Sequence, residues 1–271
     1  MKYTCYALSI VLWLSSVVHV YATGQIPDRM IYKGDTLKIF ANPLEQLYSN
    51  DSLHPAFFGA KEACESTACW RGYQATWEIS EDNLYLVGIY SCCYNDDKVS
   101  ADLKNLFGEK CINGRVKADW FTGKIVSPQG KLLYYVHMGY GSLYEKEVEL
   151  QFESGLLIDT KNYDNSKSRI SAFRTNPEKL KKFIYRNIDW NKIPNATNGK
   201  SLLVSFSANR KGVIDSVDIR MKDSSVYAKE AARVIKSIPR WDVLYRRGEL
   251  LRMEWVVLIS FSEENRKKYR R

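Results

Sequence analysis

Cysteines are the residues of this chain whose number and grouping most suggest chemistry. Cys5 lies in an apolar N-terminal stretch, and five more follow between residues 64 and 111: Cys64, Cys69, Cys92, Cys93 and Cys111. In an oxidising compartment such a set predicts a disulfide framework. Neighbours on a strand point to opposite sides, so we expect Cys92 and Cys93 to have different partners. We expect one bridge from this pair to Cys111, and Cys64 to pair with Cys69 or with the other member.

A zinc site and a catalytic cysteine nucleophile are two more specific functions that the cysteines could have. A zinc site needs four closely paired ligands, whereas the gaps here are four, 22 and 17 intervening residues without a C-x-x-C pair. The triplet Ala68-Cys69-Trp70 resembles the end of a papain-type nucleophile motif, for which His54 or His137 could act as base. The Cys-Gly of that motif is missing, and residues 71–77 predict a strand where the papain-type cysteine opens a helix.

Acidic residues give no stronger indication of an active site. Asp96 and Asp97 are adjacent, and Glu145 and Glu147 lie two residues apart, but such pairs are common on solvated loops and strand faces. No pair of carboxylates, metal set or catalytic triad has a diagnostic spacing. We therefore predict that the chain is not an enzyme and uses no cofactor or metal.

The first 22 residues predict export. Lys2 supplies a positive charge, Tyr6–Val18 is apolar, and Val20-Tyr21-Ala22 offers a cleavage site for signal peptidase. We expect a signal peptide over residues 1–22 and a periplasmic protein. The alternative is an uncleaved anchor that holds the protein at the inner membrane, facing the periplasm, because about 18 apolar residues can just span a bilayer.

The formal net charge of +9 reflects mostly scattered basic residues. One dense cluster lies in residues 263–271, which we expect to form a solvated basic tail. The scatter gives no reason to expect nucleic acid as a partner. Membrane association is conceivable through an uncleaved signal or through this tail.

Residues 23–160 predict a mostly antiparallel β domain with disulfides. Apolar runs at 73–79 and 84–89 flank a turn at 80–83, and a second hairpin is expected around 127–130. Val148, Leu150 and Phe152 alternate with Glu147 and Glu149, which predicts a strand with one wet face.

The same half is rich in aromatic residues and resembles only uncharacterised exported Bacteroides proteins. Its rings could form a stacking surface for a glycan: Trp70, Tyr73, Trp77, Trp120, Tyr134, Tyr135 and Tyr140.

Residues 161–176 are polar, and we predict a linker there. Residues 177–262 then show the pattern of a second domain of the order helix, strand, strand, helix, strand. The expected elements are a helix from Pro177, strands at 201–208 and 213–220, a helix ended by Pro239, and a last strand at 252–261.

Four stretches of this second half resemble, in order, the TonB C-terminal domain in the form common in Bacteroidetes energy transducers. They are FIYRNIDWNKIP (183–194), GKSLLVSFSANRKGVIDSVDI (199–219), EAARVIKSIPRW (230–241) and RRGELLRMEWVVLISF (246–261). The most recognisable is the third, a helix closed by Pro239 and Trp241.

The resemblance implies an α+β fold with a three-stranded antiparallel sheet and two helices. It also implies that a partner peptide adds a strand to the edge of the sheet. The last strand is the expected docking edge, and its candidate partner-binding residues are Arg252, Glu254, Val256, Leu258 and Ser260.

The chain also departs from that family. Family transducers carry an anchor and a long Pro/Lys-rich segment, where this chain has a cysteine-bearing β domain. The proline of the family's Trp-x-Pro is missing from Trp241-Asp242-Val243. We therefore predict an exported adaptor that binds another envelope protein or peptide strand. A glycan-binding protein and an energy transducer for outer-membrane transport are the alternatives.

Overall fold

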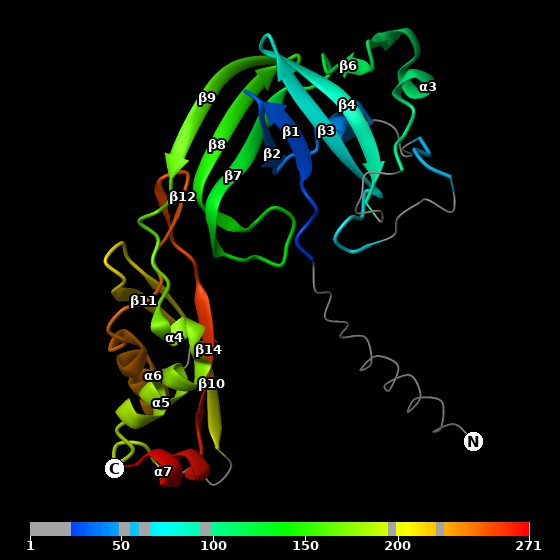
Figure 1. Cartoon of the computed structure of the whole chain (residues 1–271). Coiled ribbons are helices and arrows are strands. Elements are labelled where there is room, and N and C mark those ends of the chain that lie inside the picture. The colour runs from blue at the N-terminus through cyan, green and yellow to red at the C-terminus, as the bar shows by residue number, and fades with distance from the viewer. Residues whose placement is uncertain are drawn as a thin grey trace, which may run out of the picture. The chain divides into compact units, whose positions relative to one another are not determined.

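A computed structural model describes residues 23–48, 55–59, 66–92, 99–194, 199–220 and 225–270 (Figure 1). Over these residues the chain is a mixed α+β protein with more strand than helix. The expected signal peptide lies outside the described residues. Among the residues described, no helix has the length and apolarity needed to cross a membrane.

The fold divides into two compact units. Of the described residues, the first holds those between 23 and 127, 134–142 and 150–159, and the second holds 128–133, 143–149 and those between 160 and 270. Residues 161–176, where we expected a linker, contain the end of a long strand and a short helix, α4 (Ala172–Thr175).

The large sheet has the strand order β2-β1-β3-β4-β9-β8-β7, with β5 and β6 attached beside β4. Its strands are β1 (Asp28–Tyr32), β2 (Asp35–Ile39), β3 (Tyr73–Ser80), β4 (Asn83–Ser91), β5 (Cys111–Ile112), β6 (Arg115–Lys117), β7 (Gly123–Tyr134), β8 (Leu143–Glu153) and β9 (Leu156–Asp164). The short helices α2 (Pro43–Leu47) and α3 (Leu103–Phe107) and the 3-10 turn η1 (Gly108–Lys110) fill its connections.

The predicted hairpin at residues 80–83 is confirmed. Glu81 and Asp82 connect β3 to β4 with φ of 49° and 59°, the left-handed pair that a tight two-residue turn between twisted strands requires. Tyr73, Ala75 and Trp77 alternate inward from β3 and are fully buried, so the period-two pattern fixes which face of this strand enters the core.

Two details of the predicted strands are wrong. The segment 127–130 does not turn, because β7 continues through it, and a strand at the end of the sheet order tolerates Pro128. The face of β8 expected to be wet is buried at Glu147 and Glu149, whose exposed fractions are 5% and 2%. These carboxylates are covered by Asn165 and Arg247, partners that lie far along the sequence.

One disulfide joins Cys69 to Cys92, with the two Cα atoms 6.5 Å apart. Cys69 precedes β3 and Cys92 follows β4, and the pairing of Tyr73 with Ser91 brings the open ends of this hairpin together. The expected bridge to Cys111 is wrong, since Cys111 is a buried free thiol. Pairing of Cys64 with Cys69 is also wrong, because Cys69 is bonded to Cys92. Pairing of Cys64 with Cys93 stays a prediction, since both residues lie outside the described residues.

The second unit contains the order of elements expected from the sequence, together with a short hairpin and a C-terminal helix. Its elements are α5 (Pro177–Asn187), β10 (Lys200–Ala208), β11 (Ile214–Ile219), α6 (Val226–Lys236), β12 (Leu244–Arg246), β13 (Glu249–Leu251), β14 (Trp255–Phe261) and α7 (Glu263–Tyr269). Strands β11, β10 and β14 form a three-stranded antiparallel sheet in that order.

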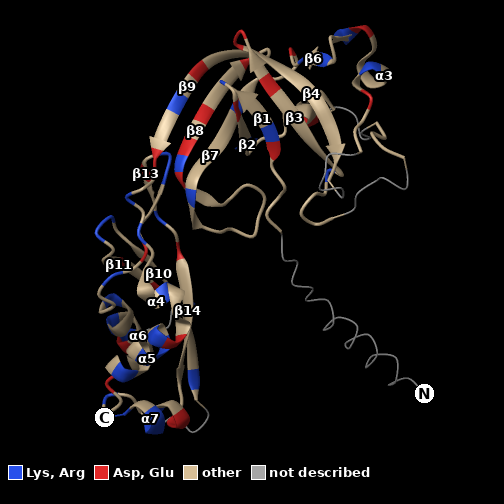
Figure 2. Cartoon of the chain, viewed as in Figure 1, with Lys and Arg blue, Asp and Glu red and all other residues tan. Residues whose placement is uncertain are grey.

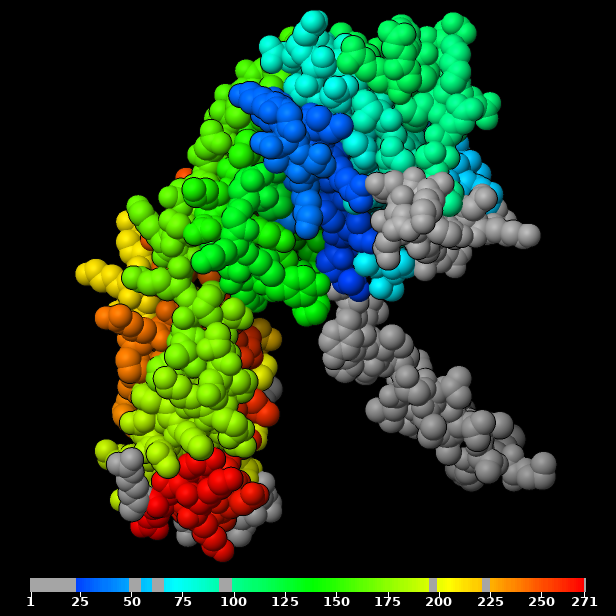
Figure 3. Space-filling model, viewed as in Figure 1, coloured from blue at the N-terminus to red at the C-terminus, as the bar shows by residue number. Residues whose placement is uncertain are grey.

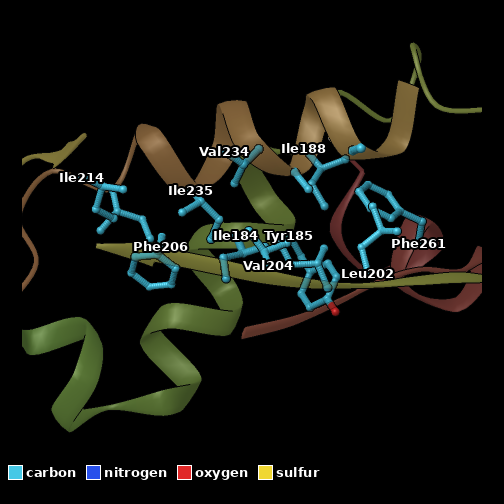
Figure 4. Packing of buried hydrophobic residues seen from close by; sticks show 14 of the residues in the cluster. Ile184, Tyr185, Ile188, Leu202, Val204, Phe206, Ile214, Val234, Ile235 and Phe261 are labelled. Carbon is cyan, nitrogen blue, oxygen red and sulfur yellow. The ribbon is translucent and has the colours of Figure 1, made fainter. Parts of the chain in front are cut away.

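The apolar stripes of α5 and α6 explain the core of this unit (Figure 4). Side chains such as Ile184, Val234 and Ile235 point from the helices onto the inward residues of β10, including Val204 and Phe206, and all are buried. Ser225 caps the start of α6 and Asn176 caps the start of α5, each by accepting a backbone N–H.

The expected basic tail is instead helix α7, which packs on the unit. Figure 3 shows its atoms, in red, directly against the yellow-green segment that contains α5. Tyr269 stacks on Tyr185 of α5 with 5.3 Å between ring centroids. Arg266 is 8% exposed and donates to the backbone oxygens of Trp190, Ile193 and Pro194, so this basic residue has a structural role.

Candidate strand-docking edge

Strand β14 lies at an edge of the three-stranded sheet. It pairs with β10 from Phe206↔Trp255 to Lys200↔Phe261, and among the described residues no strand pairs with its other side. An edge strand presents unpaired N–H and C=O groups that can pair with another chain. The strand expected from the sequence to be a docking edge therefore has a position in the sheet that permits docking.

Alternate residues of β14 face opposite ways. Ile259 and Phe261 are buried against the helices, with Trp255 and Val257 packed beside the same core. Val256 and Leu258 point to the opposite face and are 45% and 59% exposed. Leu203 of β10 lies opposite Leu258 and is 37% exposed, so this face carries a small apolar patch.

At one end of the β14 edge, the backbone groups already have hydrogen-bond partners. The backbone N–H of Ser260 donates to the Tyr185 hydroxyl at 3.0 Å, and the Ser260 carbonyl accepts from the Asn265 amide at 2.9 Å. Backbone groups of alternate residues point the same way, so those of Val256 and Leu258 also face the open edge. Within the described chain, no residue hydrogen bonds to them there, which leaves a short docking stretch from Val256 to Leu258.

The opposite edge, β11, has different chemistry. Its six residues include Asp215 and Asp218, whereas the seven residues of β14 include no Lys, Arg, Asp or Glu (Figure 2). Charged side chains on an edge discourage pairing with another strand. Of the two edges, β14 is thus the one whose sequence favours strand addition.

The predicted partner-binding residues do not all lie on this edge in the same way. Arg252 precedes β14 and forms an ion pair with Asp215 at 2.5 Å, and it also donates to the Ser207 hydroxyl at 2.8 Å. Glu254 lies 3.7 Å from Arg220. These two side chains form ion pairs within the same sheet. The backbone N–H and carbonyl of Ser260 are hydrogen-bonded to Tyr185 and Asn265. Val256 and Leu258 are the predicted residues left to face a partner.

A buried polar cluster in the first unit was not expected from the sequence. Asp28 of β1 is fully buried and accepts from the Ala75 N–H and the Trp77 indole at 3.1 Å and from Arg71 at 3.3 Å. Burial raises the pKa of Asp28 to about 6, although the Arg71 guanidinium beside it acts to lower that pKa. The ion pair is sealed from solvent, and the bonds from Ala75 and Trp77 join Asp28 of β1 to β3, which fits a structural role.

The aromatic residues proposed as a glycan surface do not form one surface. Tyr73 and Trp77 are fully buried, while Trp70 is 66% and Tyr135 47% exposed. Trp120 is half-buried, stacks on Phe107 and donates to the Pro43 carbonyl. The Tyr140 hydroxyl hydrogen bonds with Asn42 and accepts from Arg71.

The other candidates for chemistry are dispersed. Cys69 is in a disulfide, which excludes it as the papain-type nucleophile. His137 is exposed and its ring meets Tyr135 edge-on, while His54, Asp96 and Asp97 lie outside the described residues. Glu145 accepts from the Lys131 N–H, and Glu147 is buried next to Asn165. Over the described residues, no group of three or more His, Cys, Asp or Glu side chains is arranged to hold a metal.

Comparison of the chain with protein-family models, with curated proteins and with solved structures gave no significant match.

Proposed function

We propose that this protein is an exported envelope adaptor that binds a partner polypeptide by addition of a strand to β14. The observation that carries the proposal is the uncharged edge of β14, where the backbone groups of Val256 and Leu258 face outward. In strand addition, main-chain hydrogen bonds provide affinity and neighbouring side chains provide selectivity. The exposed side chains of Val256, Leu258 and Leu203 would select an apolar residue of the added strand.

The resemblance of residues 183–262 to the TonB C-terminal domain supports the same mode of binding. The proposal does not extend to energy transduction, since a transducer and an adaptor would use the same edge. Identification of the captured partner separates the two functions: an outer-membrane receptor would favour coupling to transport, and another envelope protein would favour an adaptor.

The test combines crosslinking with backbone substitution. A photo-crosslinking residue at Val256 should capture a partner in cells, whereas the same residue at Ser216 on β11 should not. Leu258→Pro removes an N–H that faces the open edge and leaves the ladder with β10 intact, so the protein should fold but lose the crosslink. Leu258→Ala keeps that N–H and should retain much of the capture.

A direct readout of strand addition is amide exchange with the purified partner. The amides of Val256 and Leu258 should exchange fast in the free protein and become protected on binding. Equal capture at Ser216 and Val256, or an undiminished crosslink in a folded Leu258→Pro variant, would contradict the proposal.

A further inference from the structure

The second unit contains a recess on the side of α4, which we call the Trp241 recess. Its volume is about 350 Å³, and it is lined by apolar groups of Phe173, Pro239 and Trp241 and by the basic residues Arg169, Lys211 and Arg240. A volume of this size lies near the lower end of ligand pockets, which span about 300–1,000 Å³. It suits one large side chain better than an extended small molecule.

The floor of the recess is closely packed. Trp241 is 5% exposed, and its ring contacts Phe206 and Trp255 edge-on with centroid distances of 4.9 and 5.9 Å. Its backbone N–H donates to the Gly212 carbonyl at 2.8 Å. Phe173 is held in turn by Phe183, with 5.1 Å between ring centroids. An apolar group that enters the recess would meet a floor that does not need to rearrange.

The rim of the recess is positively charged. Lys211 and Arg240 are exposed, and neither forms an ion pair with any residue that the structure describes. Arg169 donates to the Arg210 carbonyl at 3.0 Å, and no acidic residue lines the recess. The acid next to Trp241 in sequence, Asp242, is buried and already bound by Arg174 and by the Ser171 N–H.

The charge of the surrounding sequence has the same sign. Residues 171–271 hold 23 of the 40 Lys and Arg of the chain but only 11 of its 31 Asp and Glu. A basic region of this kind attracts acidic partners over distances of about a Debye length, roughly 8 Å at physiological ionic strength.

We propose that the Trp241 recess binds an apolar side chain that adjoins carboxylates in a partner polypeptide. The apolar side chain packs on Trp241 and Phe173, while Lys211, Arg240 and Arg169 pair with the neighbouring carboxylates. An apolar anchor in a pocket with a polar rim is the usual energetic centre of a protein interface. The recess does not include the open edge of β14, so this inference stands independently of strand addition.

The experiment uses the full chain and a defined probe. The probe is an acetylated, amidated tetrapeptide of serine, phenylalanine, aspartate and glutamate, labelled for anisotropy. Two control peptides replace either the two acids with lysine or the phenylalanine with alanine. The location of binding is read from the Trp241 indole NMR signal, which Trp241→Phe assigns. That indole N–H has no hydrogen-bond partner within the described part of the chain, so its signal is sensitive to a new neighbour.

The decisive variants are two double charge reversals. Lys211→Glu with Arg240→Glu should weaken binding of the probe by about tenfold or more, because both rim charges become repulsive. Lys267→Glu with Lys268→Glu makes the same change of net charge on α7 and should alter affinity less than about twofold. Both control peptides should bind more weakly than the probe, and added salt should weaken the probe's binding.

Three results would overturn the inference. One is the absence of a saturable shift of the Trp241 indole at millimolar probe. Another is equal binding by the lysine peptide, which would show that the rim does not select carboxylates. The third is an equal loss of affinity in the two double reversals, which would assign binding to net charge alone.

Discussion

At the scale of single residues, several charged side chains of this protein are buried. Asp28, Arg71 and Arg266 have little or no exposure, and each has several hydrogen-bond partners. A buried charge is tolerated only when its partners replace the water it loses, and removal of one partner is strongly destabilising. These residues are therefore sensitive probes of whether each unit is correctly assembled.

Asp28 should make the stability of the first unit depend on pH. Its folded pKa of about 6 lies above the ordinary value of 3.8, so the folded state holds this proton more tightly than the unfolded state. The contribution of Asp28 to the free energy of unfolding is then largest below pH 4 and falls by about 3 kcal/mol as the pH rises through 6.

The comparison that tests this is urea unfolding of wild type and Asp28→Asn between pH 4 and pH 7. Asparagine cannot titrate, so the variant should lack this part of the pH dependence. Parallel pH profiles for the two proteins would contradict a raised pKa at Asp28.

Arg266 should stabilise the fold, although it lies in the basic C-terminal helix α7. Arg266→Ala leaves the buried carbonyls of Trp190 and Ile193 without their donor, and we expect it to lower the free energy of unfolding by about 2–4 kcal/mol. Lys267→Ala, at the exposed next position, should change it by less than about 0.5 kcal/mol. Thermal unfolding measures both, and equal effects would show that α7 does not depend on this guanidinium.

At the scale of elements, the β12–β13 hairpin is held by side chains of two other segments. The side-chain oxygen of Asn165 accepts from the Gly248 N–H at 3.0 Å. The side-chain NH₂ group of Asn165 donates to the Tyr144 carbonyl and to Glu147. At the hairpin turn, the Arg247 guanidinium forms an ion pair with Glu149 at 3.3 Å, and the Arg247 backbone N–H donates to the Glu147 carboxylate. Asn165 therefore connects the hairpin to β8.

Asn165→Ala should loosen this hairpin. Loss of this fully buried side-chain amide removes its hydrogen bonds with the Gly248 N–H, the Tyr144 carbonyl and Glu147, at a cost of about 1–3 kcal/mol in the free energy of unfolding. The amide of Gly248 should also exchange faster with solvent. Lys167→Ala, an exposed neighbour, is the control, and unchanged exchange at Gly248 in Asn165→Ala would refute this assignment.

At the scale of the whole molecule, the chain forms two compact units, and the disulfide found among the described residues lies in the first. The Cys69–Cys92 bridge closes a loop across a sequence separation of 23. In the chain-entropy account, a loop of this length contributes roughly 3 kcal/mol by restricting the unfolded chain.

Replacement of both Cys69 and Cys92 by Ser should therefore destabilise one unit selectively. Amides of β3 and β4 should lose protection, while those of β10 and β14 should exchange as in the wild type. Amide exchange followed strand by strand measures this. An equal loss of protection in both units would mean that they unfold as one cooperative body.

The local patterns of this protein could be predicted from its sequence. The β3–β4 hairpin followed from a polar turn between alternating apolar runs, and the elements of residues 177–262 followed from apolar periodicity closed by Pro239. These features depend on neighbours within a few residues, which a sequence displays directly. The exposed Val256 and Leu258 were also predictable, because period-two alternation assigns them to one face of β14.

The remaining features could not be predicted, because they depend on contacts between residues that are distant in sequence. The pairing of Tyr73 with Ser91 selected Cys69–Cys92 among the possible bridges and left Cys111 free. Asn165 and Arg247 buried the carboxylates of β8 that alternation assigned to solvent. Tyr185 and Asn265 closed one end of the β14 edge, and the rim of the Trp241 recess came from three separate segments. Long-range burial and hydrogen bonding, which no local pattern records, fixed these outcomes.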